Sequence, residues 1–251
     1  MPLNIQKMGT TPTPPRVFIY GGPGIGKSSV AAQSFKPVFL PTEDGLDQIS
    51  CDAFPISRSY EEFKTHLTSL LTEDHPYRTV VIDTVDWLEP LIFNRVCADY
   101  HASAIEKVDG GYGKGFSYAL AYWGELKSLL QELRDTKRMA VIFISHATTK
   151  EIHDPETGDM TQYIPKINAK AASFLMEWCD AVLYLTRQHG AARGEDGGER
   201  VFRTAPSVHY YAKNRYNLPN ELPLDWKTLQ DHITRNLPHN HKEQNHGNAQ
   251  S

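Results

Sequence analysis

A short glycine-rich stretch near the start of the chain combines residue types that bind phosphate. Gly21, Gly26, Lys27 and Ser28 match the pattern G-x-x-x-x-G-K-[ST], between an apolar run and a helical pattern, as a phosphate-binding loop requires. Glycines leave room for backbone N–H groups to wrap around phosphate oxygens. We therefore predict an ATP site with contacts from Gly21, Gly22, Pro23, Gly24, Ile25, Gly26, Lys27, Ser28 and Ser29.

Three side chains give this loop its expected chemistry. Lys27 is predicted to reach the β- and γ-phosphates, and the Ser28 hydroxyl to ligate Mg²⁺. Asp83 ends the apolar run RTVVIDT (78–84), which predicts a carboxylate at the edge of the sheet where ligands bind. The expected cofactors are ATP and Mg²⁺, with Ser28 and Asp83 at the metal ion.

Hydrolysis also needs a carboxylate that orients and deprotonates the attacking water. In many ATPases that glutamate directly follows the acidic strand end, but here Thr84 follows Asp83. Glu43 ends the second apolar run (37–42) and is predicted at the same edge of the sheet. We assign Glu43 as the catalytic base; the alternative is a solvated loop acid next to Asp44.

The composition describes an ordinary soluble globular protein. The chain has 251 residues, 40% hydrophobic and 22% charged, and its 26 basic and 30 acidic residues give a net charge of −4. This balance argues against a broad basic surface for duplex nucleic acid. The three cysteines lack metal-ligand spacing, and no apolar run is long enough to span a membrane. We expect a cytoplasmic protein of a bacterium or a phage-infected host.

Apolar runs alternate with helical patterns, which predicts an α/β fold with a mainly parallel central sheet flanked by helices. Helices are expected over 59–71 and 118–135, and a terminal β-hairpin from RVFRT (200–204) and VHYYAK (208–213). Two irregular segments stand out: the glycine-rich 106–117, and 148–167, which reads as a hairpin with the tip DPETGD. The predicted organisation is a flexible lead (1–14), one ATPase domain (15–228) and a disordered polar tail (229–251).

The order of these features resembles the RecA/RadA recombinase core. There a strand ending in E-x-x-L-D supplies the catalytic glutamate and an aspartate near the adenine, which implies these roles for Glu43 and Asp47. A polar residue ending the fifth strand senses the γ-phosphate in that family, and His146 holds the matching position. The resemblance implies a RecA-like P-loop NTPase fold.

A family of small phage-type RecA-like ATPases, implicated in single-strand annealing and recombination, is more similar still. Its members also carry GYGKGF, DPETG, EWCDAVLY, AKNRY and ELPLDW in this order, and the resemblance covers residues 15–228. In RecA-like proteins the two irregular segments face single-stranded DNA. The implied DNA contacts are Lys107, Tyr112, Lys114, Phe116, Lys150, Lys166 and Lys170. The alternatives are a surface hairpin, a flexible connection or a protein contact.

Lys213 and Arg215 end the last patterned part of the chain. Residues two apart on an extended segment point the same way, so these cations are expected on one face, about 6–7 Å apart. The resemblance implies that they act catalytically on the γ-phosphate bound by a neighbouring subunit. A surface strand end and a DNA-backbone contact are the alternatives.

Together these features predict an Mg²⁺-dependent ATPase that acts on single-stranded DNA in phage-type recombination or annealing. We expect a homo-oligomeric ring or filament with ATP between subunits. Since no extra N-terminal domain precedes the core, DNA pairing is expected to depend on a single-strand-binding partner protein. A replicative-helicase-like motor and a slowly hydrolysing annealing module remain the alternatives.

Overall fold

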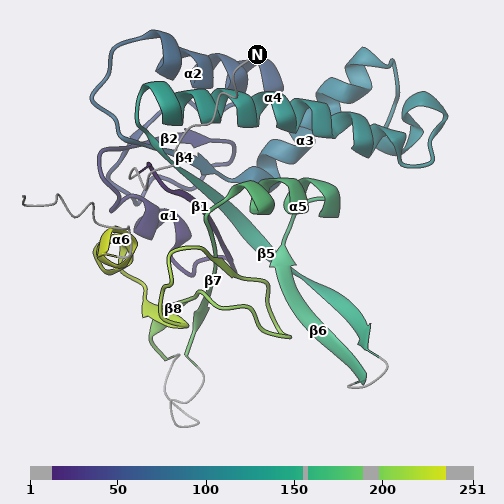
Figure 1. Cartoon of the computed structure of the whole chain (residues 1–251). Helices are drawn as coiled ribbons and strands as arrows, with labels where there is room; N and C mark the ends of the chain where they lie inside the picture. Colours follow the sequence, from purple (N-terminus) through teal and green to yellow (C-terminus); the bar gives the residue numbers. More distant parts are fainter. Residues whose placement is uncertain (1–12, 155–157, 189–197, 236–251) are drawn as a thin grey trace, which may run out of the picture.

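The computed structural model describes residues 13–154, 158–188 and 198–235 (Figure 1). Strands pair in the order β10-β8-β7-β1-β5-β4-β2-β3, and every pair from β7 to β3 along this path is parallel. The strands of this path are β1 (Arg16–Gly21), β2 (Pro37–Pro41), β3 (Asp52–Ala53), β4 (Thr79–Asp83), β5 (Ala140–Asp154), β7 (Ala181–Arg187), β8 (Arg200–Arg203) and β10 (Glu221–Pro223). The fold is therefore a mixed α/β fold with a mostly parallel central sheet, consistent with a P-loop NTPase.

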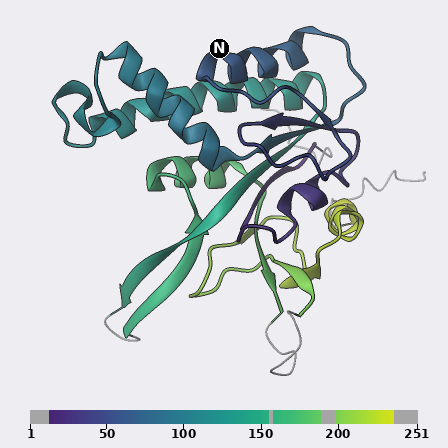
Figure 2. The same cartoon turned by 180° about the vertical axis from the view of Figure 1, so that it is seen from behind.

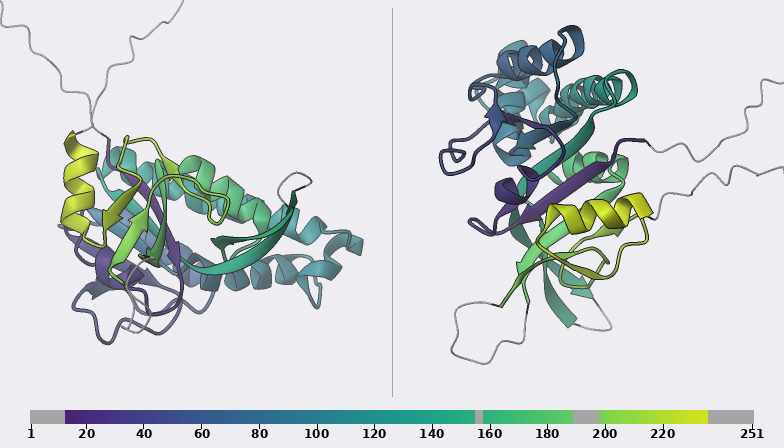
Figure 3. Two further views of the ribbon diagram at one scale, coloured as in Figure 1. Left: turned by 90° about the horizontal axis from the view of Figure 1, so that it is seen from below. Right: turned by 90° about the vertical axis from the view of Figure 1, so that its left-hand side faces the viewer.

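Helices cover both faces of this sheet, because alternate residues of its strands are apolar on opposite sides. Phe18 and Tyr20 of β1 pack with one core cluster, and Val17 and Ile19 with the other. The first face carries α2 (Tyr60–Thr72), α3 (Val85–Asp99), α4 (Lys114–Thr136) and α5 (Ala169–Trp178). The second carries α1 (Lys27–Ala31) and α6 (Trp226–Arg235), and Figure 3 shows α6 across the strands from α2 and α4.

The last helix corrects one predicted boundary. We predicted a disordered tail from residue 229, but α6 continues to Arg235 because Trp226, Leu229 and Ile233 are buried against the sheet. Residues 236–251 of that tail lie outside the described residues, as do residues 1–12 of the predicted lead. Among the helices of the described ranges, none combines the length and the apolar character that crossing a membrane requires.

The predicted C-terminal β-hairpin is wrong. β8 pairs antiparallel with β7 and β10 rather than with residues 208–213. Of the run VHYYAK only Lys213 enters a strand, β9 (Lys213–Asn214), which pairs with the start of β7. The intervening segment is held by isolated bridges, one of them between Tyr163 and Tyr210.

The predicted hairpin at 148–167 is confirmed, and it is continuous with the central sheet. β5 runs without a break from the sheet into the hairpin, where it pairs antiparallel with β6 (Gly158–Pro165). The pairing reaches Asp154 and Gly158, and the tip residues 155–157 lie outside the described residues. Figure 2 shows the hairpin projecting away from the helical layer.

Candidate nucleotide site

The loop between β1 and α1 has a backbone that only glycine adopts without strain. Gly24 and Gly26 have positive φ angles of 67° and 104°. A Cβ atom on Gly26 would also lie 2.7 Å from Nη1 of Arg200. The sequence pattern of this loop therefore follows from its geometry.

Lys27 is buried beneath the loop. Its Nζ donates to the carbonyl oxygens of Gly22 (2.9 Å) and Gly21 (3.2 Å), and only 6% of the residue is exposed. Burial lowers the pKa of Lys27, while the nearby carboxylates of Asp83, Asp86 and Glu43 oppose that shift. The ammonium group is held where it can exchange loop carbonyls for phosphate oxygens.

Asp83 ends β4 beside the loop, as the sequence predicted. It is 5% exposed, and burial raises its pKa, against the opposing effects of a hydrogen bond with Ser28 and the charge of Lys27. A desolvated carboxylate beside a hydroxyl fits Mg²⁺, which binds through one or two protein oxygens plus substrate phosphates. Within the described residues no three acidic, histidine or cysteine side chains form a metal cage.

Glu43 is brought to Asp83 by the pairing of β2 with β4, which sets Pro41 opposite Asp83. Just beyond the strands, the Thr42 hydroxyl donates to the carbonyl of Thr84 (2.7 Å) and accepts from its N–H (3.0 Å). Burial raises the pKa of the Glu43 carboxyl, an effect that His146 partly offsets. A carboxyl with a raised pKa is a stronger base than a solvated loop acid.

His146 lies between Glu43 and an aspartate that we did not predict, Asp86 in the first turn of α3. The backbone N–H of His146 donates to Asp86 Oδ1 and its Nδ1 lies 2.9 Å from Oδ2, while Glu43 Oε1 is 4.0 Å from Nδ1. Burial acts to raise the pKa of Asp86, but the hydrogen bonds from His146 outweigh it and the pKa is lowered. Asp86 thus orients the imidazole through Nδ1. The sequence signal was a second aspartate, three residues after Asp83.

These groups surround one cavity of about 390 Å³. The segment after β2 forms one wall with Asp44, Gly45, Leu46, Gln48 and Ile49, whereas Asp47, predicted near the adenine, is exposed and does not line the cavity. Arg200 of β8 forms part of the opposite wall and donates to the Ile25 carbonyl at 3.3 Å. We did not predict Arg200, because its position depends on the pairing of β8 with β7.

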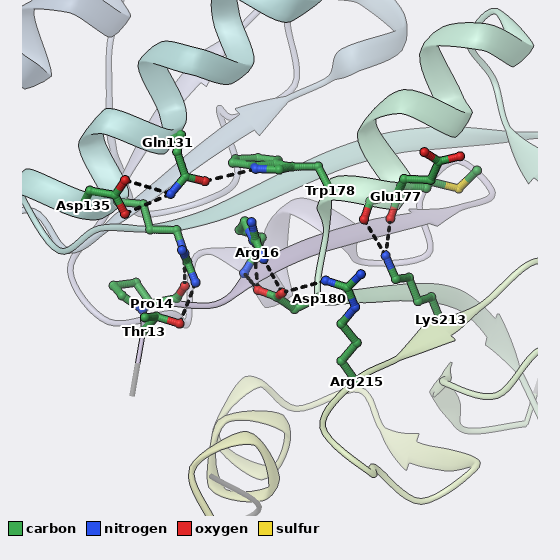
Figure 4. Close-up of polar contacts among 12 residues, drawn as sticks. Thr13, Pro14, Arg16, Gln131, Asp135, Glu177, Trp178, Asp180, Lys213 and Arg215 are labelled. Atoms are coloured by element: carbon green, nitrogen blue, oxygen red, sulfur yellow. Dashed lines mark hydrogen bonds and ion pairs between the residues drawn. The ribbon is translucent and has the colours of Figure 1, made fainter. Parts of the chain in front are cut away.

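Lys213 and Arg215 lie at the other edge of the sheet, where β1 and β7 begin (Figure 4). Lys213 Nζ donates to the carbonyls of Met176 (2.9 Å) and Glu177 (2.7 Å) at the end of α5. Arg215 pairs with Asp180 at 3.6 Å and its side chain is 54% exposed. The two cations therefore lie at the edge opposite this chain's own phosphate loop.

The predicted DNA residues fall into two groups. Tyr112 is fully exposed, and Lys107 is an exposed residue of the 3₁₀ segment η1 (Ile105–Gly110). The segment 106–117 is not wholly irregular, because α4 begins at Lys114, whose Nζ bonds Asp109. Phe116 packs edge-on against Phe93, with ring centroids 5.4 Å apart, so the prediction that its ring faces DNA is not supported.

The second group lies on the hairpin and on α5. Lys150 and Lys166 are exposed on or beside the hairpin strands. Lys170, in the first turn of α5, donates to the Ser117 hydroxyl of α4 at 3.0 Å. The start of α5, which follows the hairpin in the chain, and the start of α4 are therefore neighbours.

Comparisons with known proteins agree with this site. The family model of the AAA domain matches residues 13–216, so the chain belongs to this family of P-loop ATPases. The SPbeta prophage-derived uncharacterized protein YorG of Bacillus subtilis (strain 168) is 26% identical over 210 residues, which is 80% of this chain. The chain spans 59% of the length of that relative. Membership of the family implies nucleotide binding and ATPase activity.

Proposed function

We propose that the protein is an Mg²⁺-dependent ATPase of the RecA type that acts on single-stranded DNA in phage-type recombination or strand annealing. The observation that carries this proposal is the placement of Glu43 at the end of β2, beside Asp83 and 4.0 Å from His146. The base thus comes from a neighbouring strand rather than from the position after Asp83. The prophage origin in the name of the similar protein supports the phage setting.

Each residue of the site has a definite task in hydrolysis. Lys27 balances negative charge on the phosphates, and Ser28 with Asp83 would hold Mg²⁺, which neutralises charge on the phosphate oxygens. Glu43 accepts the proton of the water that attacks the γ-phosphorus, a task helped by its raised pKa. Asp86 fixes the ring of His146 at the cavity, where the imidazole would sense the γ-phosphate.

β5 links this site to the proposed DNA-binding region. The strand carries His146 at the cavity and continues as the first strand of the hairpin to Asp154. Lys166, after the second strand, donates its N–H to the His146 carbonyl at 2.9 Å. A shift of His146 on hydrolysis would therefore act on both strands of the hairpin.

Subunits in the proposed assembly would meet head to tail. Arg215 cannot serve its own nucleotide from the opposite sheet edge, but a heterologous contact would bring it to the next subunit's cavity. Such contacts close into a ring or extend as a filament.

ATP hydrolysis with and without single-stranded DNA tests the DNA part of this proposal. We expect stimulation that rises with oligonucleotide length until one assembly is covered. Asp83→Asn should remove both basal and stimulated hydrolysis, which excludes a contaminating ATPase. An unchanged rate at every DNA length contradicts a DNA-acting function and leaves the ATPase assignment standing.

Mixing two inactive variants tests the assembly. Glu43→Gln and Arg215→Ala proteins should each hydrolyse ATP poorly, whereas a mixture should recover part of the rate at interfaces that unite an intact Glu43 with an intact Arg215. A mixture that co-assembles but stays inactive rules out action between subunits.

A further inference from the structure

A second cavity, of about 630 Å³, lies between the base of the hairpin and the first face of β7. Its aromatic wall is a stack of three tyrosines. Tyr184 of β7 stacks with Tyr163 of β6 at 5.4 Å between ring centroids and 18° between planes, and with Tyr210 at 5.1 Å and 24°. Tyr163 is 42% exposed, so the stack is open to solvent at the hairpin.

The wall is held in place by hydrogen bonds to the central sheet. The Tyr20 hydroxyl of β1 lies 2.6 Å from the Tyr211 carbonyl oxygen and 3.1 Å from that of Tyr163. The backbone N–H of Tyr163 donates to the His209 carbonyl at 2.8 Å. The stack is therefore preorganised, which lowers the entropic cost of binding a flat ligand.

The remaining lining is polar and includes one guanidinium group. It comprises the hydroxyls of Thr161 and Thr186 and the side chains of Arg203 and His209. No carboxylate of the described residues lines the cavity, although Arg203 pairs with Glu221 outside it. Flat aromatic faces beside hydroxyls and a guanidinium group suit a nucleobase with its anionic sugar-phosphate, and do not suit a cationic or purely aliphatic ligand.

We propose that this cavity holds an unpaired nucleobase of single-stranded DNA, stacked on the open face of Tyr163. The inference rests on the function proposed above. It adds a stacking contact with DNA bases to the weak attraction between the hairpin charges and the DNA phosphates. The hairpin lysine Lys150 is followed directly by Glu151, so phosphate attraction there is weak. Stacking is tolerant of sequence and places the strand beside the hairpin that β5 connects to His146.

Binding of a fluorescein-labelled oligodeoxythymidine to the full chain, followed by anisotropy, tests this site. Tyr163→Ala should weaken binding roughly 5- to 100-fold, the range for loss of one base–aromatic stack. Tyr163→Trp should retain it, and Thr186→Trp, which fills the cavity, should weaken it. Phe35→Ala, at an aromatic 66% exposed and outside this cavity, is the matched control. The effect of Tyr163→Ala should persist at high salt, unlike that of lysine substitutions.

The outcomes separate this inference from the proposed function. If the wild-type protein binds the strand while Tyr163→Ala and Thr186→Trp, folded by thermal melting, bind equally well, the stacking site is wrong and the DNA function stands. If the wild-type protein binds no oligonucleotide, both fail. If thymidine monophosphate displaces the strand at an equal concentration of bases, the cavity serves free nucleotides and the assignment to a strand is overturned.

Discussion

The two edges of the sheet both gather charged side chains, but the pKa values of Glu43 and Asp83 at one edge shift in the opposite direction to that of Asp180 at the other. At the nucleotide edge burial raises the pKa values of Glu43 and Asp83. At the other edge the hydrogen bonds and charge of Arg16 outweigh burial, and the pKa of Asp180 is lowered. The difference lies in the partners: hydrogen bonds from Arg16 lower the pKa of Asp180, as those from His146 lower that of Asp86, whereas Glu43 and Asp83 share the charge of Lys27.

This contrast separates a binding edge from a structural one. Arg16 donates to Asp180 through Nε (3.0 Å), Nη2 (2.5 Å) and its backbone N–H (3.1 Å), and its guanidinium lies over the Trp178 ring (Figure 4). Those charges satisfy one another within the chain. Glu43 and Asp83 place carboxylates at the nucleotide edge whose negative charge a bound metal ion would balance.

The largest expected effect is on catalysis at the nucleotide edge. Glu43→Gln should lower the ATPase rate roughly 10²- to 10⁴-fold, because it removes the proposed general base and keeps the shape of the side chain. ATP affinity, measured by titration with a fluorescent analogue, should change little. A variant that hydrolyses ATP at half the wild-type rate would show that another group is the base.

The next effect is on stability at the structural edge. Asp180→Asn should destabilise the fold by about 3 kcal/mol, because Arg16 loses a partly buried partner. Asp135→Asn, an exposed acid beside Gln131 at the same edge, should cost less than about 0.5 kcal/mol. Urea unfolding of both variants checks the difference, and equal costs would show that the Asp180 network is not a structural clamp.

A pH-dependent effect is expected from Glu89, which accepts the backbone N–H of Asn168. Burial raises its pKa to about 7. Between about pH 4.5 and pH 7 the folded state therefore keeps the proton on Glu89, whereas the unfolded chain has lost it. The free energy of unfolding consequently falls as the pH rises through this range. Titration of Glu89 should cost the wild-type protein at most roughly 3 kcal/mol of stability between pH 4 and 8. Glu89→Gln should remove this part of the pH dependence. Parallel stability–pH curves for the two proteins would exclude a neutral Glu89.

The smallest expected effect distinguishes the two cations at the structural edge. Lys213→Met should cost about 1 kcal/mol, because Lys213 caps the carbonyl end of α5. Arg215→Met should change the free energy of unfolding by less than about 0.5 kcal/mol, since its ion pair is largely exposed. Urea unfolding is again the measurement. A larger cost for Arg215 would reverse these roles and argue against its being available to another subunit.

The catalytic group shows how far sequence patterns reach. The loop from Gly21 to Ser28 and the strand ending in Asp83 were predictable because each is encoded by residues that are adjacent in the sequence. Glu43 and His146 were predicted from strand ends, and the structure brings both to the cavity. Asp86 was missed because its contact with His146 joins residues 60 positions apart.

The sequence by itself determined the phosphate loop, the succession of buried strands along the chain and the acidic strand ends, since these depend on local residue spacing and on burial. Only the tertiary structure decided which strands became neighbours. It paired β8 with β7 instead of with residues 208–213, which placed Arg200 at the cavity beside the phosphate loop. It also set Lys213 and Arg215 at the far edge and stacked Tyr163, Tyr184 and Tyr210. Such pairings depend on packing between distant segments, which no local pattern encodes.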